Sequence, residues 1–82
     1  MQITYTSSVH TDAGWRSVTI EARAEQISPA MARVVEVLAI DGEPPVGTLS
    51  RTGARRQQYW AGGVARREVG ARKRLSACTV TD

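Results

Sequence analysis

The chain contains no phenylalanine, and its only aromatic residues are Tyr5, Trp15, Tyr59 and Trp60. With so few aromatic side chains, the core must be built mainly from Val, Ile, Leu and Ala. Such a core gives a modest free energy of unfolding, so a partner or a second copy would add useful stability. The lone cysteine, Cys78, excludes an intrachain disulfide and fits a reducing cytoplasm.

Long hydrophobic runs are also missing. The longest apolar stretch, residues 37–40, is far too short to span a membrane. The first residues show no basic region followed by an apolar run, so the sequence predicts no signal peptide. With 82 residues, of which 41% are hydrophobic and 23% charged, the chain has the composition of one globular domain over residues 1–82. We expect this domain in the cytoplasm.

Groups that bind metals or carry out chemistry are scarce. His10 and Cys78 are the only residues of their kinds, whereas a zinc site needs about four nitrogen or sulfur ligands, or three plus water. A Cys–His nucleophilic pair is the catalytic alternative, but we expect Cys78 in a strand and His10 in a polar loop. The glycines form no nucleotide-binding loop, and no paired carboxylates suggest acid–base catalysis. We therefore predict no enzyme activity, no cofactor and no metal.

Alternation of apolar and polar residues predicts two strands at the N-terminus. Residues 2–6 alternate around Ile3 and Tyr5, and residues 15–25 alternate for longer. One face of the second strand carries Val18, Ile20, Ala22 and Ala24. The polar residues 7–14 between the strands indicate a loop, so the two strands should form a β-hairpin with a solvent-exposed outer face.

The stretch from Ser28 to Ile40 carries two opposing signals. Ser28 suits a helix N-cap and Pro29 suits the first helical position. Apolar residues then follow at helical spacing: Met31, Val34, Val35 and Leu38. Many residues here are β-branched, which favours a strand. We favour a helix over residues 29–40, because the cap, the proline and the spacing agree, and we expect it to cover the apolar face of the hairpin.

The second half of the chain is predicted to hold further helical pieces and a late strand. Residues 53–60 suit a helix, and Gly62 and Gly63 predict a break before a second piece over residues 64–69. Residues 75–81 are rich in Thr, Val and small side chains and indicate a strand. The expected fold is α+β: a small antiparallel sheet, made of the N-terminal hairpin and a late strand, packed with one or two helices.

Charge is divided unevenly along the chain, whose net charge is +3. Residues 1–50 carry three basic and six acidic side chains, a net −3, whereas residues 51–82 carry eight basic and two acidic ones, a net +6. Arginine suits phosphate, because its planar fork donates two parallel hydrogen bonds and stacks on bases. The predicted binding residues are Arg51, Arg55, Arg56, Tyr59, Arg66, Arg67, Arg72, Lys73 and Arg74.

This uneven charge indicates a basic face that meets an anionic macromolecule, either a nucleic acid or an acidic protein surface, including a nucleoprotein complex. A small chain without catalytic groups suits stoichiometric binding. We expect an inhibitor of the phage or mobile-element type that caps a nucleic-acid-binding or acidic surface of a host defence complex. The alternatives are a small DNA- or RNA-binding regulator and a structural subunit of a larger assembly. Homodimer formation is left as an open alternative, and no membrane partner is expected.

Overall fold

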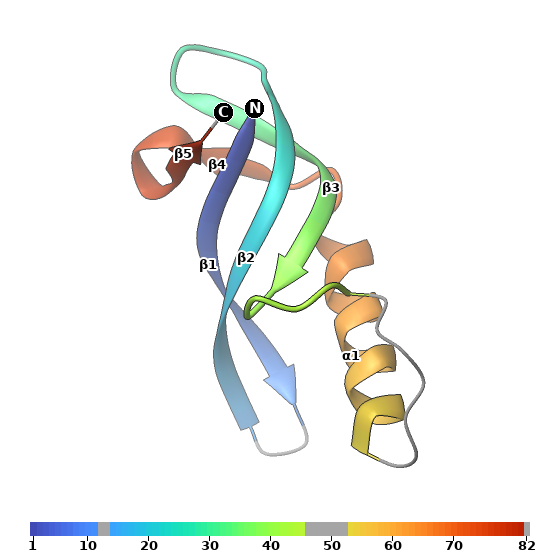
Figure 1. The fold of residues 1–82 in the computed structure, drawn as a ribbon. Coiled ribbons are helices and arrows are strands. Elements are labelled where there is room, and N and C mark those ends of the chain that lie inside the picture. The colour runs from blue at the N-terminus through green and yellow to red at the C-terminus, as the bar shows by residue number, and fades with distance from the viewer. Residues whose placement is uncertain (12–13, 46–52, 82) are drawn as a thin grey trace.

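The computed structural model describes residues 1–11, 14–45 and 53–81, and leaves the side chains of residue 11 and residues 53–60 undescribed. Within this part of the chain, five strands form one antiparallel sheet, accompanied by one α-helix (Figure 1). In chain order the elements are β1 (Gln2–Thr11), β2 (Gly14–Gln26), β3 (Met31–Ile40), α1 (Gly53–Glu68), β4 (Arg72–Arg74), the 3₁₀ turn η1 (Leu75–Ala77) and β5 (Thr79–Thr81). The fold is therefore a small α+β fold dominated by its sheet.

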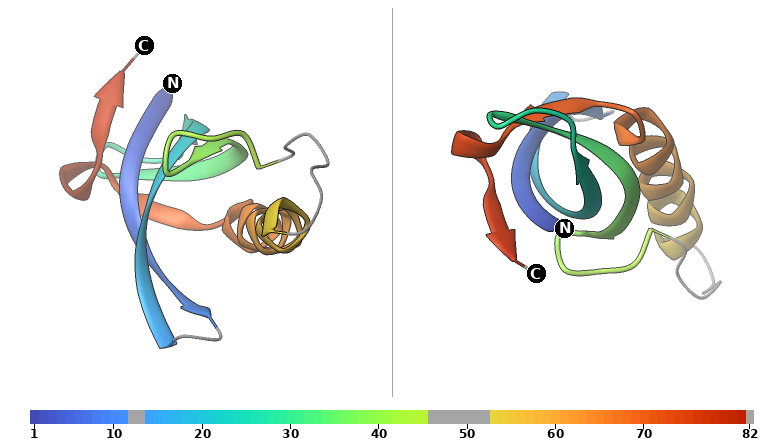
Figure 2. Two further views of the ribbon diagram at one scale, coloured as in Figure 1. Left: turned by 60° about the horizontal axis from the view of Figure 1, so that its bottom comes forward. Right: turned by 90° about the horizontal axis from the view of Figure 1, so that it is seen from above.

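The sheet curls strongly. Its strand order is β4-β3-β2-β1-β5, so the two edge strands follow one another in the chain. Only η1 and Cys78 separate β4 from β5, and such a short connection requires the two edges of the sheet to approach each other. Seen from above, the strands run around a common centre (Figure 2). The inside of this curl holds the hydrophobic core.

The predicted hairpin is confirmed, and it is longer than the sequence suggests. β1 and β2 pair without a register shift up to Thr11↔Gly14. Residues 7–11, predicted as loop, are strand, because Ser and Thr tolerate an extended backbone and Val9, only 3% exposed, continues the inward alternation. The inward residues of the hairpin are Ile3, Tyr5, Val9, Val18, Ile20, Ala22 and Ala24.

The helix predicted over residues 29–40 is wrong. Residues 31–40 form β3, which lies in the sheet beside β2 and does not cover its apolar face. The pairing of β3 with β2 shifts register twice, and Val35 and Leu38 are left without a partner. Each shift is a β-bulge with one extra residue. The buried residues of β3 are Ala32, Val34, Val37 and Ile40. Two of their three intervals are three residues instead of two, so the apolar spacing imitates a helix.

α1 is one continuous helix, so the break predicted at Gly62 and Gly63 and the separate piece over residues 64–69 are wrong. Glycine inside a helix costs about 1 kcal/mol relative to alanine, an amount that burial elsewhere on the helix offsets. The second half of α1 turns one face toward the core: Ala61, Val64, Ala65 and Glu68. Val64 is 2% exposed and belongs to the core cluster.

The C-terminal segment contains more elements than its composition indicates. Residues 75–81, predicted as one strand, divide into η1 and β5, and β5 pairs with residues 2–4 of β1. β4, which the sequence pattern does not predict, pairs with residues 31–33 of β3. The late strand thus joins the sheet at the edge formed by β1, and the basic residues of β4 form the opposite edge.

Candidate arginine surface

The three arginines in the first half of the chain each pair with a carboxylate. The pairs are Arg16–Asp41 (2.7 Å), Arg23–Glu36 (2.8 Å) and Arg33–Glu25. All three pairs are solvent-exposed; two join β2 to β3, and the third joins β2 to Asp41, the residue that follows β3. The acidic half of the chain therefore neutralises its own cations.

The arginines of the second half behave differently. The four whose side chains are described are Arg66, Arg67, Arg72 and Arg74, and we call them the arginine surface. All four are exposed, and within the described residues none of them forms an ion pair or a side-chain hydrogen bond. The positive charge of these four arginines is thus presented to solvent without a neighbouring carboxylate among the described residues.

A short docked turn brings the end of α1 to the start of β4. Gly70, with φ of 88°, occupies the left-handed region that favours glycine. Its N–H donates to Val34 O at 2.8 Å, and Val34 N–H donates to Ala71 O at 2.9 Å. These bonds fix the turn against β3, so the arginine pair of the last helical turn and the two arginines of β4 lie on adjoining elements (Figure 1).

Lys73, a predicted binding residue, is directed away from the arginine surface. It lies between Arg72 and Arg74 in β4, and alternation places its side chain on the opposite side of the strand. Lys73 Nζ lies 3.2 Å from Glu68 Oε1 and 4.5 Å from the centre of the Tyr5 ring. Its charge is therefore engaged inside the fold.

Glu68 and Tyr5 complete this inward cluster. Tyr5 donates from its hydroxyl to Glu68 Oε1 at 2.9 Å, and both residues are buried. Burial, followed by the hydrogen bond to Glu68, raises the pKa of Tyr5 far above its usual value. The cluster joins β1, α1 and β4, and it holds β4 in the orientation that sends Arg72 and Arg74 outward.

The pairing register of β3 and β4 places two positive charges opposite each other. Arg72 lies directly opposite Arg33 of β3. Like charges at opposed positions of an antiparallel pair destabilise the sheet. Glu25 compensates Arg33, but Arg72 has no carboxylate of its own within the described residues. A bound anion would relieve this repulsion, so the site has the electrostatics of an anion-binding surface.

The remaining predicted binding residues lie outside the part of the chain whose side chains the structure describes. Arg51 lies outside the described residues, and the side chains of Arg55, Arg56 and Tyr59 lie outside the described part of α1.

His10 and Cys78 are far apart. Cys78 directly precedes β5, whose Thr79 pairs with Thr4 near the start of β1, whereas His10 lies near the other end of β1, about 20 Å further along the strand. The His10 ring makes an edge-to-face contact with Trp15, with centroids 5.3 Å apart. Cys78 Sγ donates to Arg74 O at 3.2 Å, and burial raises the pKa of the thiol. A Cys–His nucleophilic pair is excluded by this separation.

Similarity to known proteins gives no further guide. No protein-family model, curated protein or solved structure matches the chain. In residues 1–11, 14–45 and 53–81, no three His, Cys, Asp or Glu side chains gather in a way that would hold a metal ion. The same residues contain no helix that is long and apolar enough to cross a lipid bilayer. The arginine surface is the strongest candidate site in this part of the chain.

Proposed function

We propose that this protein acts by stoichiometric binding of an anionic macromolecule through the arginine surface. In this proposal it is an inhibitor of the phage or mobile-element type, which caps a nucleic-acid-binding or acidic surface of a host defence complex. One observation carries the proposal: the arginines of the first half are paired with carboxylates, whereas those of the arginine surface have none within the described residues.

The physical argument is electrostatic. Four exposed guanidinium groups on two adjoining elements attract an anion over a distance of about 8–10 Å at physiological salt. Each guanidinium donates paired hydrogen bonds that fit a phosphate or a carboxylate. The two candidate residues for nucleophilic catalysis are far from each other, since His10 lies on β1 and Cys78 lies beside β5. This separation supports stoichiometric binding. Binding without turnover is what such a surface can supply.

A matched pair of variants tests the proposal. R72Q/R74Q and R16Q/R23Q each remove two positive charges, the first from the arginine surface and the second from ion-paired arginines. The tagged chain is used to capture its partner from bacterial lysate at low and high salt, with and without nuclease. R72Q/R74Q should reduce capture by about tenfold or more, and R16Q/R23Q should not.

Equal loss in both variants would show that only net charge matters, and no loss in either would refute the proposal. The nuclease arm separates the alternatives. A regulator that binds DNA or RNA would lose its captured material after nuclease treatment, whereas an inhibitor or a structural subunit bound to an acidic protein surface would keep it.

A further inference from the structure

The two β-bulges of β3 present apolar side chains to solvent. Val35 and Leu38 are the residues that the register shifts leave without a partner on β2, and they are 40% and 38% exposed. Val35 and Leu38 are the extra residues of the two bulges, and a strand of regular alternation would not contain them. Bulges re-aim side chains and are frequent near functional sites. The strand thus departs from regular geometry where it brings apolar groups to the surface.

Val35, the first of these two residues, lies near the arginine surface. Arg33 precedes Val35 by two positions on β3, a rise of about 7 Å, and Arg72 lies directly opposite Arg33 on β4. Arg33, Val35 and Leu38 are exposed, whereas Val34 between the first two is buried in the core. The outer side of β3 and β4 therefore combines apolar groups at its centre with arginines at its edge.

Carboxylates on the same side of the sheet decide the class of partner. Glu25 and Glu36 pair with Arg33 and Arg23, and their side chains remain 48% and 55% exposed. Because each of these ion pairs carries no net charge, a continuous polyanion laid over this surface would meet uncompensated positive charge only at its edge. A protein surface with separate carboxylates can place them at that edge, and an apolar centre with arginine at the edge is typical of protein–protein interfaces.

We propose that the outer face of β3 and β4, centred on Val35 and Leu38 and bordered by Arg72 and Arg74, binds a partner protein whose surface combines apolar side chains with carboxylates. The inference rests on the proposed function, because the arginine surface supplies the charged border. It deepens that function by selecting a protein over a nucleic acid. The unpaired arginines take the partner's carboxylates, and the bulge residues bury their exposed area against its apolar groups.

The test uses a displayed library of random dodecapeptides, selected for binding to the full chain. Enriched peptides should combine Asp or Glu with Leu, Ile or Val. The tightest peptide is labelled, and its affinity is measured by fluorescence anisotropy for the wild type and three variants. V35S/L38S and R72Q/R74Q should each weaken binding by about tenfold or more. V80S is the matched control, since Val80 is 45% exposed but lies opposite the buried Ile3, on the other face of the sheet, and it should bind like the wild type.

Thermal unfolding checks that each variant folds; if V35S/L38S unfolds, the nearly isosteric Val35→Thr takes its place. Labelled single-stranded and duplex oligonucleotides form the second set of probes, and the wild type should bind them weakly. Tight oligonucleotide binding that falls in R72Q/R74Q but not in V35S/L38S would overturn this inference and leave the proposed function standing. Peptide binding unaffected by V35S/L38S would overturn it as well. If R72Q/R74Q binds both the peptide and the oligonucleotides as the wild type does, the proposed function itself is refuted.

Discussion

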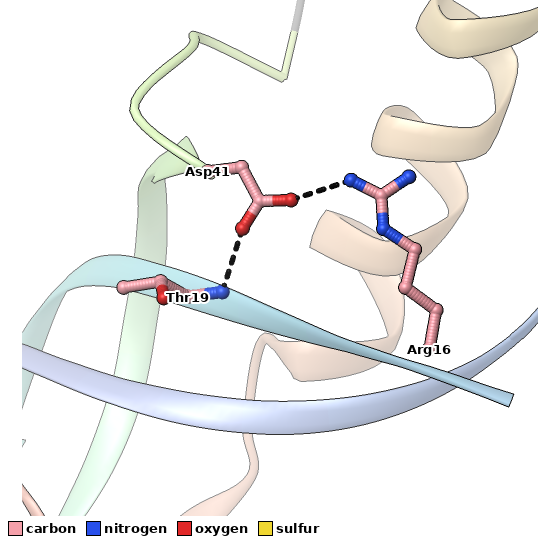
Figure 3. Close-up of polar contacts among 3 residues, drawn as sticks. All are labelled: Arg16, Thr19 and Asp41. Atoms are coloured by element: carbon pink, nitrogen blue, oxygen red, sulfur yellow. Dashed lines mark hydrogen bonds and ion pairs between the residues drawn. The ribbon is translucent and has the colours of Figure 1, made fainter.

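Asp41 extends the pairing of β2 by one residue through two hydrogen bonds to Thr19, and Figure 3 shows the one that its carboxylate accepts. The N–H of Asp41 donates to Thr19 O at 2.8 Å, and the N–H of Thr19 donates to Asp41 Oδ1 at 2.9 Å. The other carboxylate oxygen accepts from Arg16 at 2.7 Å. Asp41 has φ of 52°, in the left-handed region that Asp tolerates better than most residues. The Asp41 side chain therefore follows the last residue of β3 and accepts a hydrogen bond from the backbone of β2 at the point where the β2–β3 ladder ends.

Asp41→Ala should lower the free energy of unfolding by about 1–3 kcal/mol, because Thr19 loses its acceptor and alanine is strained at positive φ. Asp41→Asn is the control. Asparagine keeps an acceptor oxygen and tolerates the same φ, so it loses only the exposed ion pair with Arg16, worth about 0–1 kcal/mol. Urea denaturation measures both variants. Equal losses would mean that the ion pair, and not the hydrogen bond to Thr19, is the stabilising contact.

Tyr5→Phe should lower the free energy of unfolding by about 1.5–3 kcal/mol at neutral pH, because Glu68 loses a buried hydrogen-bond donor. The wild type should also lose stability in alkali. The pKa of Tyr5 is raised in the folded chain, so the stabilising effect of its neutral form is complete below about pH 10, the usual tyrosine pKa, and falls as the pH rises further.

Urea denaturation at about pH 8 and about pH 11 tests this dependence. The decline between the two should be smaller for Tyr5→Phe than for the wild type. Other titrating groups, among them Tyr59, are common to both chains, so their contributions cancel in the comparison. The same decline in both would show that the Tyr5 hydroxyl is not linked to folding.

The hairpin was predictable and β3 was not, and the difference lies in the bulges. Along β2, burial alternates without interruption from Val18 to Ala24 and the pairing with β1 has no register shift, so a period of two in the sequence matches the structure. Along β3, two extra residues change the burial period. Ser28 reinforces the misreading: its Oγ accepts from Met31 N–H at 3.1 Å, as a helix cap would, but within the turn that joins β2 to β3.

The candidate site was predictable as a charge imbalance but not as a surface. Which arginines are compensated depends on contacts between strands, such as Arg23 with Glu36, that composition does not reveal. Lys73 points inward because it lies in a short edge strand and pairs with Glu68. Glu68 also accepts a hydrogen bond from Tyr5, which is 63 positions from Glu68 in the sequence, so the sequence pattern does not reveal this cluster. Arg33 belongs to the acidic half of the sequence, yet the register sets it opposite Arg72.

Ile20→Ala and Trp15→Ala compare the contribution of a core residue to stability with that of a residue at the tip of the hairpin. Ile20 is fully buried, so its truncation should lower the free energy of unfolding by about 2–4 kcal/mol. Trp15 is 74% exposed and touches the ring of His10, so its truncation should change that free energy by about 0.5 kcal/mol or less. Urea denaturation followed by circular dichroism measures both. A large loss for Trp15→Ala would reveal a packing role for the hairpin tip.

The double variant H10A/C78S should retain full partner binding and biological activity. Nucleophilic catalysis by a thiol requires a base within hydrogen-bond reach, and here the two residues lie near opposite ends of β1, about 20 Å apart. The Cys78 thiol donates to Arg74 O, and burial raises its pKa, which disfavours the reactive thiolate.

The decisive measurement is activity against protein amount. A stoichiometric binder saturates at about one chain per target, and H10A/C78S should follow the wild-type curve. Activity far below stoichiometric amounts, abolished in a double variant that still folds by circular dichroism, would establish turnover and refute the binding function. Neither residue belongs to the arginine surface or to the bulges of β3, and the serine hydroxyl of C78S can still donate to Arg74 O, so the interface should be preserved in this variant.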